Sequence, residues 1–128
     1  MELYDRIYDL VRQIPPGKVT TYGQLGIMCG ISDSRLVGEA MNASSGIPWQ
    51  RVINARGQVS IQGATGARQR ALLEAEGILF QDNRIDLSQY GWVPDSNWLQ
   101  AHGYKIPPAF PKPKKEQADE EGEQLSLF

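Results

Sequence analysis

A glycine at position 30 separates two segments of helical character and leaves almost no linker between them. The first segment, residues 22–29, follows threonines suited to an N-cap and ends at Gly30, a typical helix stop. The second, ISDSRLVGEAMNA, begins with the capping candidates Ser32 and Asp33. Its apolar side chains fall on one helical face: Leu36, Val37, Ala40 and Met41. Two short helices joined in this way predict a helix-turn-helix, although such hairpins also occur in proteins that never bind DNA.

The segments on either side complete a mainly α fold with small β hairpins. Apolar residues at helical spacing predict a helix over residues 3–14, which a Pro-Pro-Gly run ends. Downstream, RVINARGQVSI predicts two short strands around a turn with Arg56 at its tip. A further helix is expected over residues 67–76, and a second strand pair around residues 81–83. We therefore expect one winged-helix-like helix-turn-helix domain over residues 1–94.

The composition changes after residue 94. Residues 1–94 carry 9 Lys and Arg against 9 Asp and Glu, whereas residues 95–128 carry 4 against 6, so the net charge of −2 belongs to the second part. Residues 95–123 are rich in proline and then in acidic side chains, without apolar periodicity, which predicts a flexible linker. The last five residues, QLSLF, return to apolar chemistry and suggest a ligand for another protein's groove.

The 128 residues suffice for one small core, and several classes of protein are excluded. No run of about 18 apolar residues and no signal-peptide pattern occurs, so we expect no membrane partner and a cytoplasmic, nucleoid-associated protein. A single cysteine, Cys29, excludes an internal disulfide. With His102 as the one histidine, no cluster has metal-ligand spacing, and neither a metal nor another cofactor is expected.

The run IPWQRV, residues 47–52, places a tryptophan in a loop that carries no reactive group. A cysteine or serine nucleophile needs a nearby base, normally a histidine held by a third group, and His102 lies in the predicted linker. Cys29 is better explained as a small buried apolar residue at a helix end. Glu74 and Glu76 fit the solvated face of a charged helix. The residues alone therefore argue against a catalyst.

Three runs in the same order, TTYGQLGIMCGISDSRLVGEAM, IPWQRVINARGQVS and RQRALLEAEG, resemble the alkyltransferase-like proteins. These are relatives of the DNA-binding domain of O6-alkylguanine-DNA alkyltransferase, and the resemblance spans nearly all of residues 1–94. The repair enzymes carry Pro-Cys-His-Arg-Val, whose cysteine accepts the alkyl group, and the alkyltransferase-like proteins typically replace that cysteine by tryptophan. Here the motif is Pro-Trp49-Gln50-Arg-Val, so the nucleophile is missing and Gln50 replaces a histidine that the relatives usually keep. The resemblance implies the fold of the alkyltransferase C-terminal domain and no enzymatic activity.

The resemblance also implies DNA-binding roles for three residues of the two helices. Arg35 matches the arginine finger that enters the base stack in place of a rotated nucleotide, because a planar cation can both stack and donate hydrogen bonds. Tyr22 matches the tyrosine that packs against the phosphate beside the lesion. Gly38, like Ala40, is small enough to permit close approach to the minor groove. From the residues alone, Arg35 would be a surface arginine and Tyr22 a packing residue.

A lesion pocket around Trp49 is implied in the same way. Its further lining would be Met41, Val52, Gln62 and Gly63, with Ser60 as an additional candidate. Gln62 stands where some relatives place an arginine or a tyrosine, and it offers hydrogen bonds without a cation over the base. Glu76 matches the glutamate that orients the enzymes' histidine. In the absence of that histidine, Glu76 and Gln50 are expected to be a structural remnant, paired to each other or to a backbone group.

The implied function is lesion recognition without repair. O6-alkylguanine in double-stranded DNA would be rotated out from the minor groove, left intact and handed by a monomeric protein to nucleotide excision repair proteins. Two alternatives stay open. A transcriptional regulator would share the helix-turn-helix but would bind an undamaged operator, and an alkyltransferase would have to use Cys29.

The terminal QLSLF, residues 124–128, resembles the peptide with which bacterial replication and repair proteins bind the DNA sliding clamp. In such peptides the glutamine occupies a small polar subsite and the apolar side chains fill a groove. The anchors here would be Gln124, Leu125, Leu127 and Phe128. Because a docking peptide is most accessible at the end of a tether, this position favours the interpretation.

Overall fold

The computed structural model describes residues 2–111, and three helices form its centre: α1 (Leu3–Gln13), α2 (Tyr22–Cys29) and α3 (Arg35–Asn42). They pack around one cluster of apolar side chains, to which α1 contributes Ile7, Leu10 and Val11. The helix-turn-helix is confirmed, as are the bounds of α2. Thr21 caps α2 by accepting a hydrogen bond from the Gln24 N–H at 3.1 Å, and Gly30 ends it with a φ of 75°. The mainly helical fold with small sheets was therefore predicted correctly.

One expectation about α3 is wrong, because Leu36 does not join the core. Its side chain is 37% exposed, whereas Val37, Ala40 and Met41 are buried. Ala40 and Met41 lie one helical turn after Val37, and the three side chains already close the face of α3 that meets α1 and α2. Leu36 is left on the flank of the helix, next to Arg35.

The hairpin predicted around Arg56 is also wrong, although its turn exists. Strand β2 (Val52–Ile53) pairs in parallel with β1 (Thr20–Thr21), with Val52 opposite Thr20. Both residues of β2 are buried, so this strand completes the core beside β1 instead of extending into a solvent-exposed ribbon. After the turn the chain runs without strand structure through residues 58–62 to the next helix.

Helix α4 (Gly63–Ala75) begins four residues earlier than predicted. Two glycines in its first turn obscured its start in the sequence. Gly66 is needed there, because the Ile61 carbonyl oxygen occupies the space that a Cβ atom would take. Beyond α4, β3 (Phe80–Gln81) and β4 (Arg84–Ile85) form the predicted antiparallel pair. A short helix that was not predicted, α5 (Leu87–Tyr90), follows them.

The predicted domain boundary at residue 94 is wrong, because the chain folds back onto the helices after Trp92. Helix α6 (Ser96–Ala101) places Leu99 in the core with no exposed surface. The buried Tyr104 follows and donates its hydroxyl to the carbonyl of Arg6 in α1 at 2.9 Å. A helix of six residues is too short to show an apolar periodicity in the sequence, and the four prolines that follow it suggested an unstructured linker.

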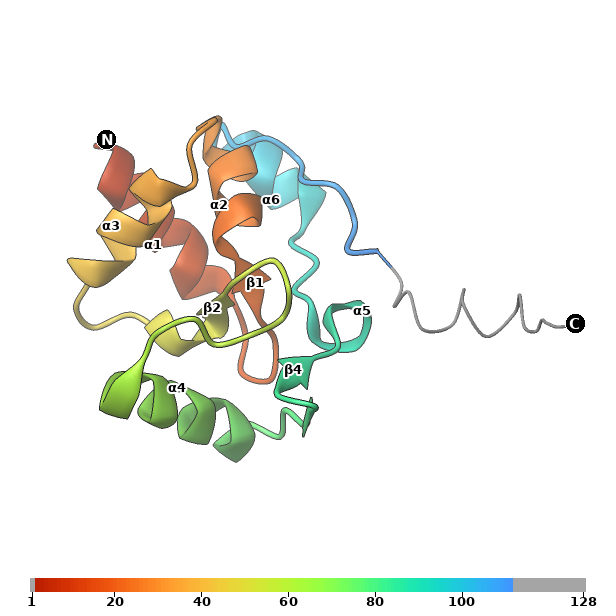
Figure 1. The fold of residues 1–128 in the computed structure, drawn as a ribbon. Helices are drawn as coiled ribbons and strands as arrows, with labels where there is room; N and C mark the ends of the chain where they lie inside the picture. The colour runs from red at the N-terminus through yellow and green to blue at the C-terminus, as the bar shows by residue number, and fades with distance from the viewer. Residues whose placement is uncertain (1, 112–128) are drawn as a thin grey trace, which may run out of the picture.

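Residues 104–110 form a strap that runs along α2 (Figure 1). The Lys105 N–H donates to the Met28 carbonyl at 2.9 Å, and the Gln24 amide donates to the Pro108 carbonyl at 3.0 Å. Between the strap and Trp92 lies a pocket of about 130 Å³, which includes none of the predicted lesion-pocket residues. The predicted clamp-binding residues lie outside the described part of the chain.

Candidate nucleic-acid interface

Trp49 lies in a single turn of 3-10 helix, η1 (Trp49–Arg51), at the end of the Ile47–Pro48 loop. The backbone N–H of Trp49 donates a hydrogen bond to the Ile47 carbonyl at 2.7 Å. The indole is half-buried and packs against the same cluster of apolar side chains that holds the first three helices together. The tryptophan that looks exposed in the sequence is therefore anchored on one side and open on the other.

The turn that carries Trp49 is held by a network centred on Glu76, the residue that follows α4. Its carboxylate accepts a hydrogen bond from the Gln50 amide at 2.9 Å and another from the Gly17 N–H at 2.9 Å. Arg51 adds a two-pronged ion pair, with Nε and Nη2 at 3.0 to 3.1 Å from the carboxylate oxygens. The second terminal nitrogen of Arg51 donates to the Ile14 carbonyl at 2.8 Å. The expected pairing of Glu76 with Gln50 and with a backbone group is present.

This network holds Glu76 in its ionised form. Burial opposes the ionisation of Glu76, but the Arg51 guanidinium, the Gly17 N–H and the Gln50 amide outweigh it and hold the Glu76 pKa below its ordinary value. Because three neighbouring groups bind the Glu76 carboxylate, its role is to hold the turn in place. Gln50, which has no titratable group, faces it where a histidine would be needed for acid–base chemistry.

Gln69 of α4 is a residue of this region that sequence reasoning missed. It is buried, and its amide nitrogen donates to the carbonyls of Gln50 and Val52 at 3.1 and 3.0 Å. Because both donations fix the amide's orientation, the Oε1 atom faces away, and no partner for it lies within residues 2–111. The buried positions Gly66, Gln69 and Leu73 follow helical spacing, which could have identified Gln69 as an inward-facing polar residue.

The residues expected to line a lesion pocket fall into two groups. Val52 and Met41 are buried members of the core. Gln62 and Gly63 are exposed at the start of α4, where Gly63 has a φ of 74° and open space in the direction of a Cβ atom. Trp49 thus packs against the apolar cluster that contains Met41 and Val52, and the pocket itself stays a prediction.

Two of the three predicted DNA-binding residues, Tyr22 and Arg35, lie at the starts of α2 and α3. Arg35, the first residue of α3, extends into solvent with a side chain that is 87% exposed. Asp33 holds it through both carboxylate oxygens, with the closest contact, from Nη2, at 2.9 Å. Gly38, one turn later, has no atom within 4 Å of where a Cβ would lie, so the helix surface there is open. This face of α3 is accessible to a large ligand.

Tyr22 begins α2 and is half-buried. Burial raises the pKa of its hydroxyl, and the neighbouring hydroxyl of Ser60 acts in the opposite direction. Tyr22 is therefore a neutral hydrogen-bonding group at physiological pH. Ser60, in the segment before α4, brings that segment against the start of α2.

Cys29 cannot replace the missing nucleophile. Its side chain is 8% exposed within the core, and burial raises the thiol pKa to about 11, despite an opposing effect of Arg6. A thiol with that pKa is almost entirely protonated at neutral pH and is a poor nucleophile. The interpretation of Cys29 as a buried apolar residue is confirmed, and its burial disfavours the alternative of an alkyltransferase that uses Cys29.

Neither a metal-binding cluster nor a membrane-spanning helix occurs in the described part of the chain. Residues 2–111 contain no group of three His, Cys, Asp or Glu side chains that could hold a metal ion. None of the helices in the same range is long and apolar enough to cross a membrane.

A family model described as the DNA-binding domain of 6-O-methylguanine DNA methyltransferase matches residues 2–78. Among curated proteins, the chain is 42% identical over 94 residues to a DNA base-flipping protein of Vibrio parahaemolyticus, covering 70% of this chain and 94% of the relative. It is also 38% identical over 104 residues to alkyltransferase-like protein 1 of Schizosaccharomyces pombe, covering 73% and 96%.

Solved structures agree with these matches. The fold superposes with a TM-score of 0.65 on alkyltransferase-like protein 1 of Schizosaccharomyces pombe in complex with damaged DNA containing O6-carboxymethylguanine, at 38% identity over 72% of this chain and 95% of that one. It superposes with a TM-score of 0.53 on the O6-methylguanine methyltransferase of Mycobacterium tuberculosis, at 31% identity over 59% and 48%.

Proposed function

Because this chain belongs to the family of the 6-O-methylguanine DNA methyltransferase DNA-binding domain, we propose that it recognises O6-alkylguanine in double-stranded DNA and leaves the lesion unrepaired. The observation that carries this proposal is the turn of Trp49, which is held firmly but contains no reactive group at the residue that the family resemblance matches to the enzymes' nucleophile. The relatives named for base flipping, and the relative solved with O6-carboxymethylguanine DNA, support the same function.

Recognition begins with rotation of the damaged nucleotide out of the duplex. Unpairing costs a few kcal/mol and is cheaper for an alkylated base that already pairs badly, so selectivity arises before any contact in the pocket. Tyr22 contacts the adjacent phosphate and helps the rotation. Arg35 enters the base stack, where its planar guanidinium fills the gap and donates hydrogen bonds to the unpaired base. The open surface at Gly38 lets α3 approach the minor groove closely.

The rotated base is then held against Trp49 without being altered. An aromatic ring stacks on a purine, and the alkyl group adds apolar contact area. Because neither a thiolate nor a base stands at positions 49 and 50, the alkyl group stays on the guanine. The persistent complex would be a marker for nucleotide excision repair proteins in the cytoplasm, formed by a monomer of the chain.

Incubation with duplex DNA that carries a radiolabelled O6-methyl group tests the absence of repair. We expect all of the label to remain on the DNA. Label on the protein would show transfer, and labelled methanol would show hydrolysis, and either result would overturn the proposal. A repair-active alkyltransferase serves as the positive control on the same duplex.

We further propose that the terminal peptide binds the bacterial DNA sliding clamp through Gln124, Leu125, Leu127 and Phe128. Support comes from the order of polar and apolar side chains in QLSLF and from its place after the charge-rich residues 112–123. Deletion of residues 124–128 should abolish clamp binding and leave lesion binding unchanged. Ser126→Ala, which alters a position between the anchors, is the control, and a clamp affinity unchanged by the deletion would refute this partner.

A further inference from the structure

The turn that presents Arg56 is fixed at both ends. The Asn54 side-chain carbonyl accepts hydrogen bonds from the N–H groups of Arg56 and Gln58, both at 2.9 Å. Gly57 closes the turn by donating to the Asn54 carbonyl at 3.0 Å, and its own carbonyl accepts from the Ile85 N–H at 2.8 Å. An Asx-type turn tied to a neighbouring strand is a rigid mount for the side chain at its tip.

The turn requires a glycine at position 57. Its φ of 79° lies in the left-handed region, and the Ile85 carbonyl oxygen occupies the position that a Cβ atom would need. Only glycine fits under both conditions. The turn is therefore packed directly against β4, and Arg56 extends from a backbone that is hydrogen-bonded to this strand.

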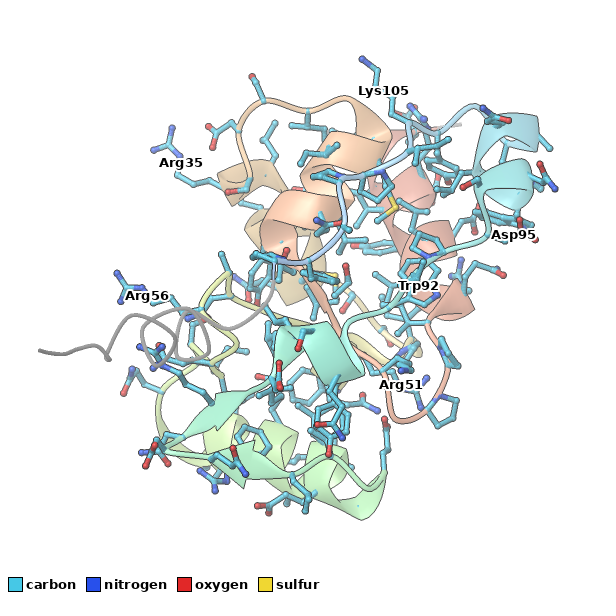
Figure 2. All side chains as sticks on the ribbon, turned by 90° about the vertical axis from the view of Figure 1, so that its right-hand side faces the viewer. Arg35, Arg51, Arg56, Trp92, Asp95 and Lys105 are labelled. Carbon is cyan, nitrogen blue, oxygen red and sulfur yellow. The ribbon has the colours of Figure 1, made fainter. Side chains whose placement is uncertain are left out.

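Arg56 lies on the face that carries the predicted DNA contacts. Figure 2 shows Arg35 and Arg56 projecting from the same side of the molecule. The segment after Arg56 reaches the start of α2, where Ser60 neighbours the hydroxyl of Tyr22. In Figure 1 this segment passes in front of β1 and β2, whereas α1 lies behind α2 and α3.

The two arginines differ in charge compensation. Asp33 binds Arg35 through both carboxylate oxygens, and Glu39, one turn further along α3, adds to the negative charge around it. Arg56 takes part in none of the ion pairs formed among residues 2–111. Arg56 therefore brings a positive charge without an ion-pair partner among residues 2–111 to this face.

We propose that Arg56 is a phosphate-binding residue that anchors undamaged and damaged DNA alike, while Arg35 stays paired with Asp33 until a nucleotide rotates. This inference rests on the proposed function for the identity of the ligand. A guanidinium on a rigid turn suits phosphate oxygens, which fix the position of the duplex and carry no sequence information. The two arginines would then act in order, Arg56 during the search and Arg35 at the lesion.

Arg56→Gln in the full chain tests the anchor. Each phosphate contact contributes about 0.9 to the slope of log affinity against log salt concentration. We expect the substitution to reduce that slope by about 0.9 and to weaken binding about fivefold to tenfold at 0.1 M salt, equally for duplexes with and without O6-methylguanine. Arg12→Gln on α1 removes the same charge from a residue that is paired with Asp9 and should change neither quantity.

Arg35→Gln completes the test, because it should weaken binding to the lesion duplex and leave binding to the undamaged duplex unchanged. An unchanged salt slope for Arg56→Gln, or a loss confined to the lesion duplex, would overturn the inference. The proposed function can fail separately. If the chain binds the two duplexes equally but Arg56→Gln still reduces the salt slope, the phosphate contact of Arg56 stands and the proposed lesion recognition fails.

Discussion

Two arginine–carboxylate pairs in this molecule have the same chemistry and different surroundings. Arg51 and Glu76, beneath the Trp49 turn, have side chains that are 15% and 13% exposed, and two further groups bind the carboxylate. Arg35 and Asp33, at the start of α3, are 87% and 44% exposed. Removing one member of the inner pair leaves a charge with little access to water, whereas water replaces a lost partner at the outer pair. The inner pair is therefore suited to hold a loop. In the outer pair, Arg35 can leave Asp33 and bind a ligand instead.

The turn that carries Trp49 keeps a firm structure although it contains no reactive group. Here Gln50 keeps the carboxylate contact through its amide, and Arg51 ties it to the end of α1. The geometry of the turn is thus maintained by hydrogen bonds that need no proton transfer.

The largest effect is expected for Glu76→Ala, which breaks the inner pair. Arg51 would remain partly buried without its anion, and Gln50 and Gly17 would each lose a hydrogen bond. We expect the free energy of unfolding to fall by about 3 kcal/mol. Glu74→Ala is the matched control, because Glu74 forms an exposed ion pair with Arg70 on the same helix and should cost at most about 0.5 kcal/mol. Urea denaturation of both variants measures the difference, and equal losses would remove the distinction between the two pairs.

A smaller effect is expected for Gln69→Leu, which removes the donor beneath the same turn. The carbonyls of Gln50 and Val52 would lose their partner, while the unpartnered Oε1 atom would also disappear. Because these changes partly offset each other, we expect a loss of about 1–2 kcal/mol in the free energy of unfolding. A gain in stability would show that Gln69 is not needed to hold the turn.

The pH dependence of stability distinguishes the inner pair further. The folded-state pKa of Glu76 lies below its unfolded value, so its contribution is complete above the unfolded pKa and is lost as the pH falls through the folded pKa. The urea midpoint should therefore decrease on acidification below about pH 4.5, and less so in Glu76→Gln, which has no carboxylate to protonate. Identical acid profiles for the two proteins would contradict the role of Glu76.

The smallest effect on folding is expected for Asp33→Asn, which breaks the outer pair. Asparagine retains an oxygen that can accept the hydrogen bond of the Arg35 N–H, so the helix start should survive and the urea midpoint should not move. Affinity for the lesion duplex should rise severalfold, because Arg35 is released and one negative charge leaves the DNA-facing side. Asp9→Asn, which breaks an exposed pair on α1, is the control and should leave DNA binding unchanged. A weaker affinity in Asp33→Asn would show that Asp33 positions Arg35 for DNA instead of withholding it.

Local rules were sufficient where neighbouring residues decide the structure. The start and end of α2 follow from a threonine cap and a glycine stop, and the turn around Arg56 follows from its Asn-Ala-Arg-Gly sequence. The contact between Gln50 and Glu76 was predicted through the family resemblance, which matches both residues to partners in the repair enzymes.

Distant contacts decided the features that sequence reasoning missed. Val52 pairs with Thr20, 32 residues earlier, because both are buried beside the same helices, and no local pattern reveals that partner. Helix α6 exists because Leu99 and Tyr104 find apolar surface on α1 and α2. Leu36 is exposed because three other side chains already fill the inner face of α3. Each of these outcomes depends on how much buried surface the rest of the chain leaves available.

The central claim, recognition of a lesion without its repair, is tested most directly by the affinity of the full chain for two duplexes that differ only in one guanine, unmodified or O6-methylated. We predict at least tenfold tighter binding to the methylated duplex, since its damaged base is cheaper to unpair, and recovery of the methylated base intact from the complex. Equal affinities for the two duplexes, or a methyl group missing from the recovered DNA, would contradict the account.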